Sequence, residues 1–200
     1  DLDLFYMQKI PTKSIVITGT NGKSTACKLI QHIFKTNKLD AQLGGNIGKP
    51  ILDLKINQKS IVIIEASSFQ LSYTKFIKPT FAAILNIGSD HLDWHNTIAN
   101  YKNSKFKIFS KQDGKDVALL NNKKFIQLFE KKNYLSKLKI VKINTLSKTI
   151  KKKITNSFLI SEPNLENLVF AYEIAKLFRI KEKIFLKGVN SFKGLPHRHE

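Results

Sequence analysis

Residues 14–30, SIVITGTNGKSTACKLI, have the residue types and the spacing needed to bind phosphate. The run SIVIT is typical of a buried strand, GTNG of a tight loop, and KST of the start of a helix. This order directs backbone N–H groups and the positive end of the helix toward an anion. Lys23 would reach the outer phosphates, and the Ser24 hydroxyl would bind Mg²⁺. The stretch predicts a nucleotide phosphate site formed by Gly19, Thr20, Asn21, Gly22, Lys23, Ser24 and Thr25.

The loop departs from the common G-x-x-x-x-G-K-[ST] spacing, because Ile17 occupies the first glycine position of that pattern. The alternative is a Gly-Asn turn followed by an ordinary helix cap at Ser24. Turn chemistry alone does not require Gly19, Gly22, Lys23 and Ser24 together, so phosphate binding is the favoured interpretation.

Two further segments supply candidate metal ligands at strand ends. Glu65 ends the apolar run IVIIE, where a buried carboxylate is costly unless a cation compensates it. Mg²⁺ shared with Ser24 is one such cation, and a neighbouring lysine is the alternative. The next apolar run, FAAILNI, leads into GSDHLDWH. One of the histidines, His91 or His95, could instead cap a helix or pack against Trp94. His91 is the better ligand candidate because it lies nearest the strand end.

A lysine in an apolar stripe is the least expected feature. Ile98, Tyr101, Lys105 and Ile108 recur with the spacing of one face of a helix. Such a lysine normally extends its amine to water. An amine held near metal ions instead has a lowered pKa, and the neutral form can take up carbon dioxide to become a carbamate, an anionic oxygen ligand. Spacing alone favours the lysine that reaches water.

The elements that must position these residues alternate between strands and helices. Strands are predicted at residues 14–18, 60–66, 81–87 and 116–121, and helices at 24–36, 97–110, 123–132, 164–178 and 181–192. This alternation predicts an α/β fold of the P-loop NTPase type, with a mainly parallel sheet flanked by helices and ligands at the carboxyl ends of the strands. Residues 139–160 predict two or three short strands, and therefore a small antiparallel addition.

Composition limits the class of protein. The chain has 200 residues, of which 42% are hydrophobic, so it can bury an ample core. Its formal charge of +19 suggests a nucleic-acid partner, but only Arg179 and Arg198 among the 34 basic residues are arginines. Lysine-rich solvated faces are the favoured interpretation. No apolar run has membrane-spanning length. The lone Cys27 fits a packed side chain and a reducing, cytoplasmic compartment.

The motifs GTNGKST, LGGNIGKP, EASSFQL, NIGSDHLDWH, NYKNSKFKIF and GLPHRHE together resemble the Mur ligase family. They occur in the family's order and extend from Gly19 to Glu200, nearly the whole chain. Within the family, the block EASSFQL favours the D-glutamate-adding member over those that add L-alanine, a diamino acid or a dipeptide, and over folylpolyglutamate synthase.

The resemblance assigns roles by position. It implies that Lys23 and Ser24 hold the ATP phosphates and a first Mg²⁺ with Glu65, and that His91 and a carbamylated Lys105 hold a second Mg²⁺, which reverses the preference from spacing. The remaining positions belong to three groups. Those around the muramoyl substrate are Asn46, Ser67, Ser68 and Gln70, for which a turn and helix caps are the alternative; those near the adenine are Asn164 and Asn167; and the hinge motif contains His197 and Arg198, the latter near the phosphates. Pro163 replaces the family's usual histidine.

The resemblance also implies the organisation and reaction of the whole protein. Residues 1–12 would end a preceding nucleotide-substrate domain, 13–194 would form the central ATP-binding domain, and 195–200 would begin the hinge to a C-terminal domain. The implied reaction is ATP-dependent addition of D-glutamate to UDP-N-acetylmuramoyl-L-alanine through an acyl phosphate, by a cytoplasmic monomer. The rivals are another Mur-type ligase, folylpolyglutamate synthase, and a basic P-loop module that binds nucleic acid or acts as a switch.

Overall fold

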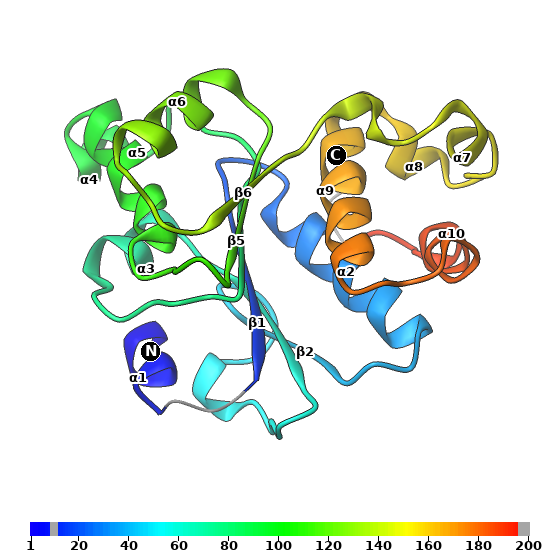
Figure 1. The fold of residues 1–200 in the computed structure, drawn as a ribbon, viewed down its shortest axis with the longest axis horizontal. Helices are drawn as coiled ribbons and strands as arrows, with labels where there is room; N and C mark the ends of the chain where they lie inside the picture. The colour runs from blue at the N-terminus through cyan, green and yellow to red at the C-terminus, as the bar shows by residue number, and fades with distance from the viewer. Residues whose placement is uncertain (9–11, 196–200) are drawn as a thin grey trace.

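The computed structural model describes residues 1–8 and 12–195. Six strands form one sheet in the order β2-β3-β1-β4-β5-β6, and every neighbouring pair is parallel. The strands are β1 (Lys13–Thr18), β2 (Ala41–Gly45), β3 (Ile61–Glu65), β4 (Phe81–Ile84), β5 (Val117–Leu120) and β6 (Lys137–Ile140). Figure 1 shows helices packed on both sides of this sheet.

Side chains of the central strands alternate between two hydrophobic cores, one on each face of the sheet. In β1, Ile15 and Ile17 point into one core and Val16 into the other. The helices that cover the first face are α2 (Lys23–Thr36), α7 (Lys148–Lys152), α8 (Ser157–Ile160), α9 (Glu162–Leu177) and α10 (Glu182–Ser191). Those on the second face include α1 (Leu2–Met7), α3 (Ser68–Tyr73), α5 (Ile98–Phe106) and α6 (Lys123–Lys131).

The short elements lie in the connections. They are α4 (Leu92–His95) and the 3₁₀ turns η1 (Ile51–Asp53), η2 (Lys107–Phe109) and η3 (Ile143–Thr145). Within the described ranges, no helix has the length and apolar character that crossing a membrane requires.

The strand order creates a switch point between β1 and β4. The chain leaves β1 toward β2 on one side of the sheet, whereas it leaves β4 toward β5 on the other side. Ligands of open α/β sheets bind in the crevice that opens at the carboxyl ends of strands at such a point. The loops that follow β1 and β4 therefore form the expected ligand site.

The predicted long elements are confirmed to within a few residues, but the antiparallel addition is wrong. All sheet pairs in the described part of the chain are parallel. Residues 139–160 contain the end of β6, then η3, α7 and α8 instead of two or three strands. Ser147 and Asn156 cap α7 and α8 with their side chains, so local polar capping prevails over the β-branched isoleucines of this stretch.

Candidate active site at the carboxyl ends of the strands

The phosphate loop joins β1 to α2. Gly22 is the N-cap of α2 with φ of 80°, and the helix begins at Lys23, so the alternative of a helix cap at Ser24 is wrong. A side chain at position 22 would place its Cβ 2.3 Å from Oδ1 of Asn167, which leaves room only for glycine. The first N–H groups of a helix have no acceptor within it, so those of α2 are available to an anion. Lys23 Nζ donates to the carbonyl of Thr20 at 2.8 Å.

Asn86, just after β4, contacts the phosphate loop through both ends of its amide. Its Oδ1 accepts from the N–H groups of Thr20 at 3.1 Å and Asn21 at 2.8 Å. Its Nδ2 donates to the Asn21 carbonyl at 3.2 Å and to Glu166 Oε2 at 2.8 Å. The Thr20 hydroxyl lies 3.1 Å from the Tyr101 hydroxyl and accepts from the Gly88 N–H. The loop is thus tied to the segment after β4 and to α5.

Lys105 is buried, and its amine lies against the phosphate loop. Its Nζ donates to the Gly19 carbonyl at 2.8 Å and lies 4.6 Å from the centre of the Tyr101 ring. The side chain is 1% exposed, so the expectation from spacing that it reaches water is wrong. Burial, reinforced by the charge of Lys23, lowers the pKa of the Lys105 ammonium to about 7. A substantial share of the amine is therefore neutral at neutral pH.

Glu65 ends β3 beneath the turn that carries Asn46. Asn46 Nδ2 donates to Glu65 Oε1 at 3.0 Å, and the Asn46 N–H donates to the Glu65 carbonyl at 2.9 Å. Gly45 has φ of 102°, and a Cβ there would lie 2.4 Å from that carbonyl. The glycines of GGNIG therefore allow two chain segments to approach closely and hold Asn46 over the end of β3.

The donor set at Glu65 fits a magnesium ion. Glu65 is 2% exposed, and its Oε2 has no hydrogen-bond partner among the described residues. No ion pair joins it to a lysine there, which disfavours the alternative of lysine neutralisation. A bound cation would stabilise this unpartnered buried carboxylate oxygen, and Mg²⁺ prefers oxygen ligands such as this carboxylate and the buried Ser24 hydroxyl. In the described part of the chain, no group of three or more His, Cys, Asp or Glu side chains is arranged so that it could hold a metal ion.

One cavity of about 260 Å³ brings several of these residues together. The loop after β1, the turn after β2, the start of α3 and the segments after β4 each contribute to its wall. The residues that line it are Gly19, Lys23, Asn46, Ser67, Ser68, Phe69, His91, Tyr101 and Lys105. The cavity therefore brings together Gly19 and Lys23 of the predicted phosphate residues, His91 and Lys105 of the predicted metal ligands, and Asn46, Ser67 and Ser68 of the predicted substrate residues, whereas Ser24 and Glu65 do not line it.

The two histidines differ in their surroundings. His91 has φ of 52°, its side chain is 45% exposed, and its Nε2 lies 3.4 Å from Asp90 Oδ2. His95 is 4% exposed, packs against the Trp94 ring, and bonds the Ser68 hydroxyl through Nε2 at 3.0 Å. Burial lowers the pKa of the His95 imidazole, and the charge of Lys105 acts in the same direction. His91 is thus the accessible histidine of the cavity.

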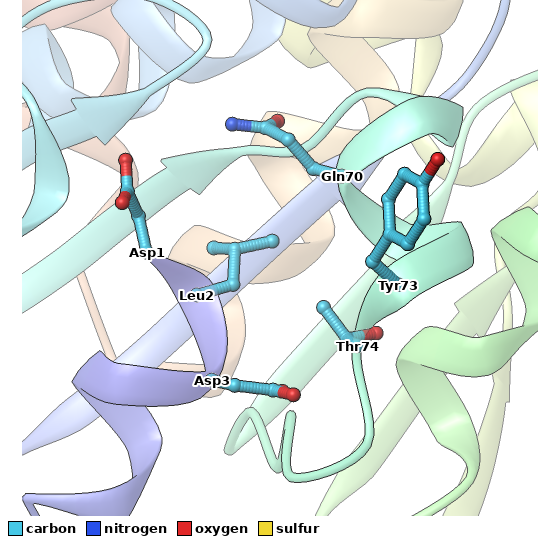
Figure 2. A pocket seen from close by; sticks show the side chains of 6 residues that line it. All are labelled: Asp1, Leu2, Asp3, Gln70, Tyr73 and Thr74. Atoms are coloured by element: carbon cyan, nitrogen blue, oxygen red, sulfur yellow. The ribbon is translucent and has the colours of Figure 1, made fainter.

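Ser67 and Gln70 form a capping box at the start of α3, as the alternative interpretation of these residues predicts. Gln70 does not line the cavity that holds Ser67 and Ser68. It lines a separate cavity of about 360 Å³ between α1 and α3, where Figure 2 shows it opposite Asp1 and Leu2.

The nucleotide candidates on α9 lie beside the phosphate loop. Asn167 is 2% exposed, donates to Asn164 Oδ1 at 3.3 Å, and packs against Gly22. Pro163 stands in the first turn of α9, where a missing N–H costs nothing. Residues 196–200, which include His197 and Arg198, lie outside the described residues.

Sequence reasoning missed three residues of the site: Asn86, Glu166 and Phe69. Asn86 and Glu166 contact the phosphate loop directly or through one partner. The Phe69 ring lies 4.8 Å from the His91 ring. A polar residue at the end of the apolar run FAAILNI was a usable signal for Asn86, because such a position lies at the carboxyl edge of a parallel sheet. Nothing in the sequence marks Glu166 among the polar residues of its helix.

Comparison with known proteins agrees with this geometry. The family model of the Mur ligase middle domain matches residues 17–188. The UDP-N-acetylmuramoylalanine–D-glutamate ligase of Rickettsia felis is 34% identical, over 99% of this chain and 48% of that protein. The ligase of the same name from Oenococcus oeni is 36% identical, over 93% of this chain and 46% of that protein. The chain spans about half the length of these curated relatives.

Solved structures share the fold at lower identity. MurF from Acinetobacter baumannii superposes with a TM-score of 0.70 at 18% identity, over 97% of this chain and 49% of that one. MurF from Thermotoga maritima in complex with ADP gives 0.70 at 17% identity, over 96% of this chain and 51% of that one. Since the family model covers residues 17–188 and the curated relatives match at 34% and 36% identity, the chain belongs to the Mur ligase family.

Proposed function

We propose that the full-length protein is an ATP-dependent, ADP-forming ligase that joins D-glutamate to UDP-N-acetylmuramoyl-L-alanine in peptidoglycan precursor synthesis. The names of the curated relatives support this acceptor and this amino acid. The observation that carries the proposal is the single cavity in which Lys23 of the phosphate loop meets buried Lys105, His91 and Asn46. A cation-rich cavity of this kind suits a reaction between two anions.

In the first step, a carboxylate oxygen of the acceptor substrate bonds to the terminal phosphorus of ATP, and the bond to the ADP oxygen breaks. The product is an acyl phosphate, which has the leaving group that a carboxylate lacks. The negative charge that develops at the phosphoryl oxygens is stabilised by Lys23 and by the N-terminus of α2. Lys23 must then exchange its contact with the Thr20 carbonyl for one with phosphate.

Magnesium would be held by Glu65 and Ser24, whose oxygen donors fit it, and a second ion by His91 and Lys105 as a carbamate. When bound, these ions neutralise phosphate charge. Carbamylation joins the neutral Lys105 amine to carbon dioxide and releases one proton. The carbamate nitrogen keeps one N–H, which can still donate to the Gly19 carbonyl, whereas the new carboxylate oxygens can only accept hydrogen bonds or bind a cation.

In the second step, the D-glutamate amine, after losing a proton, attacks the acyl carbon. The tetrahedral intermediate collapses, phosphate leaves, and an amide bond remains. Asn46, Ser67 and Ser68 line the cavity and are proposed to orient the acceptor, with Gln70 on the neighbouring cavity. No side-chain nucleophile takes part.

The remaining assignments belong to the same proposal. Asn164 and Asn167 would lie near the adenine, and Arg198 would approach the phosphates from the hinge. Residues 1–12 and 195–200 would connect this domain to a nucleotide-substrate domain and to a domain that binds D-glutamate. The proposed enzyme is a monomer without nucleic-acid partners or membrane insertion.

The test is phosphate release by the full-length protein with Mg·ATP, UDP-N-acetylmuramoyl-L-alanine and one amino acid at a time. We expect release and amide product with D-glutamate only. Lys23→Ala should lower kcat by at least about 100-fold, because the transferred charge loses its cation. Release with L-lysine or diaminopimelate but not with D-glutamate would assign the protein to another Mur-type reaction, and release with a folate acceptor would assign it to folylpolyglutamate synthesis.

A further inference from the structure

Asn86 occupies the inner side of the phosphate loop, where four of its hydrogen bonds converge. An asparagine amide offers two acceptor sites on Oδ1 and two donors on Nδ2. Thr20 and Asn21 N–H groups use both acceptor sites, and the Asn21 carbonyl and Glu166 Oε2 use both donors. Reversal of the amide would place donors against donors, so these four partners fix its orientation.

Glu166 extends this network to the neighbouring strand. Its second oxygen, Oε1, accepts from Asn121 Nδ2, just after β5. Glu166 directly precedes Asn167 on α9, and Asn167 packs against Gly22. The phosphate loop is thus held at Thr20 and Asn21 by Asn86 and at Gly22 by Asn167, and α9 links both contacts.

These contacts divide the N–H groups of the loop into two sets. Those of Thr20 and Asn21 face Asn86 and are already occupied. Those at the start of α2 lie beyond Gly22 and have no acceptor within the helix. An anion that enters the cavity therefore meets the N–H groups of the helix start together with Lys23.

We propose that Asn86, held by Glu166, is a positioning residue that orients the phosphate loop so that the first turn of α2 and Lys23 bind the nucleotide phosphates. The inference rests on the nucleotide site of the proposed function, but not on the acceptor or the amino acid. Loss of the Asn86 amide leaves two bonds between the loop and the segment after β4: the Thr20 N–H to the Asn86 carbonyl and the Gly88 N–H to the Thr20 hydroxyl, each at 2.9 Å.

The direct test is amide hydrogen exchange of the full-length protein, resolved at residues 20 and 21. In Asn86→Ala, the Asn21 N–H loses its acceptor and should exchange at least about tenfold faster. The Thr20 N–H keeps its bond to the Asn86 backbone and should change less, so it serves as an internal reference. The dissociation constant of Mg·ADP should rise at least about tenfold, because the binding groups are no longer preorganised.

Exchanging the donor of Asn86 and the acceptor of Glu166 tests whether their contact positions the loop or only adds to the general stability of the fold. Asn86→Asp keeps the acceptors but sets a carboxylate against Glu166. Adding Glu166→Gln restores a donor to that contact and leaves the net charge of the pair as in the natural protein. We expect Asn86→Asp alone to weaken ADP binding at least about tenfold, and the double variant to recover part of that loss, because it restores the contact with position 166 but not the one with the Asn21 carbonyl.

Asn190 provides a matched control on α10. It also braces a loop, accepting from the Thr155 N–H and donating to the Lys153 carbonyl, each at 3.0 Å, but it does not line the cavity. Asn190→Ala should leave the hydrogen-exchange rate of the Asn21 N–H and the ADP affinity unchanged. The inference would be overturned if, in Asn86→Ala, either the exchange rate of the Asn21 N–H or the ADP affinity equalled that of the unsubstituted protein. It would also be overturned if the double variant recovered none of the lost affinity. An enzyme that binds ADP but does not use D-glutamate would overturn only the proposed reaction. If Asn86→Ala does not fold, the ADP affinity of Asn86→Asp with and without Glu166→Gln decides whether the inference holds.

Discussion

At the residue scale, Lys105 is a lysine whose amine is buried in the protein and not exposed to water. Its pKa of about 7 in the folded protein lies below its usual value of 10.5, so the folded state binds fewer protons than the unfolded state between these pH values. Stability therefore falls as the pH is lowered from 10.5 to 7 and is not lowered further by this group below 7.

Replacement of Lys105 by methionine should remove this pH-dependent cost. Relative to the natural protein, Lys105→Met should raise the free energy of unfolding most at pH 7 and below. The difference should shrink toward pH 10. Urea unfolding of both proteins across this range measures it. A difference that is the same at every pH would contradict the lowered pKa.

The carbamate on Lys105 has its own test. Lys105→Ala should lose at least about 100-fold in kcat, and short carboxylic acids such as formate or acetate should restore part of it by filling the place of the carbamate. Lys102→Ala, on the same helix but outside the cavity, should retain activity without added acid. An active Lys105→Ala enzyme would contradict the carbamate.

At the element scale, the turn after β2 determines where Asn46 and Glu65 meet. Gly45→Ala would push a Cβ to within 2.4 Å of the Glu65 carbonyl at a φ of 102°. We expect a loss of about 2 kcal/mol or more in the free energy of unfolding. Gly114→Ala is the matched control, since its Cβ would meet no atom within 4 Å, and it should change stability by less than about 0.5 kcal/mol. Equal effects of the two substitutions would refute the close approach.

The elements that were predictable are those with a strong local signal. Residues 24–36 and 164–178 were predicted as helices, and α2 and α9 begin within two residues of these bounds. β2 was missed because AQLGG carries two glycines, which disfavour strands locally. It forms because β3 pairs with it along its whole length, a contact between residues distant in sequence.

At the scale of the whole molecule, nucleotide binding should be visible as stability. A ligand at 100 times its dissociation constant adds about 2.7 kcal/mol, which corresponds to about 5–11 °C in Tm for a chain of this size. We expect Mg·ADP to raise the Tm of the full-length protein by several degrees, less than for this chain alone because a longer protein has a larger entropy of unfolding, and Lys23→Ala to abolish the shift. Duplex DNA at 0.15 M salt should give none. A shift with DNA that disappears steeply with salt, and none with Mg·ADP, would instead favour the basic nucleic-acid module.

The candidate site was predictable only in part, and for a physical reason. Strand-end motifs identified Lys23, Glu65 and His91, because parallel strands bring their carboxyl ends to one edge. Spacing alone misjudged Lys105, since whether a lysine on an apolar stripe reaches water depends on what covers that stripe. Tyr101 and the phosphate loop cover it. Glu166 likewise acquires its role only when α9 docks beside β4 and β5.

The walls of the 260 Å³ cavity come from separate pairs of loops. Segments after β1 and β4 bring Lys23 and Lys105, whereas segments after β2 and β3 bring Asn46 and Ser68. The two pairs meet where His95 bonds Ser68 and where the Phe69 ring lies against the His91 ring, so we expect a mutation in one pair to affect the other mainly through these contacts. Under the proposed function, the segments after β1 and β4 bind the nucleotide and those after β2 and β3 orient the acceptor. We therefore expect related ligases with different acceptors to diverge mainly in the segments after β2 and β3.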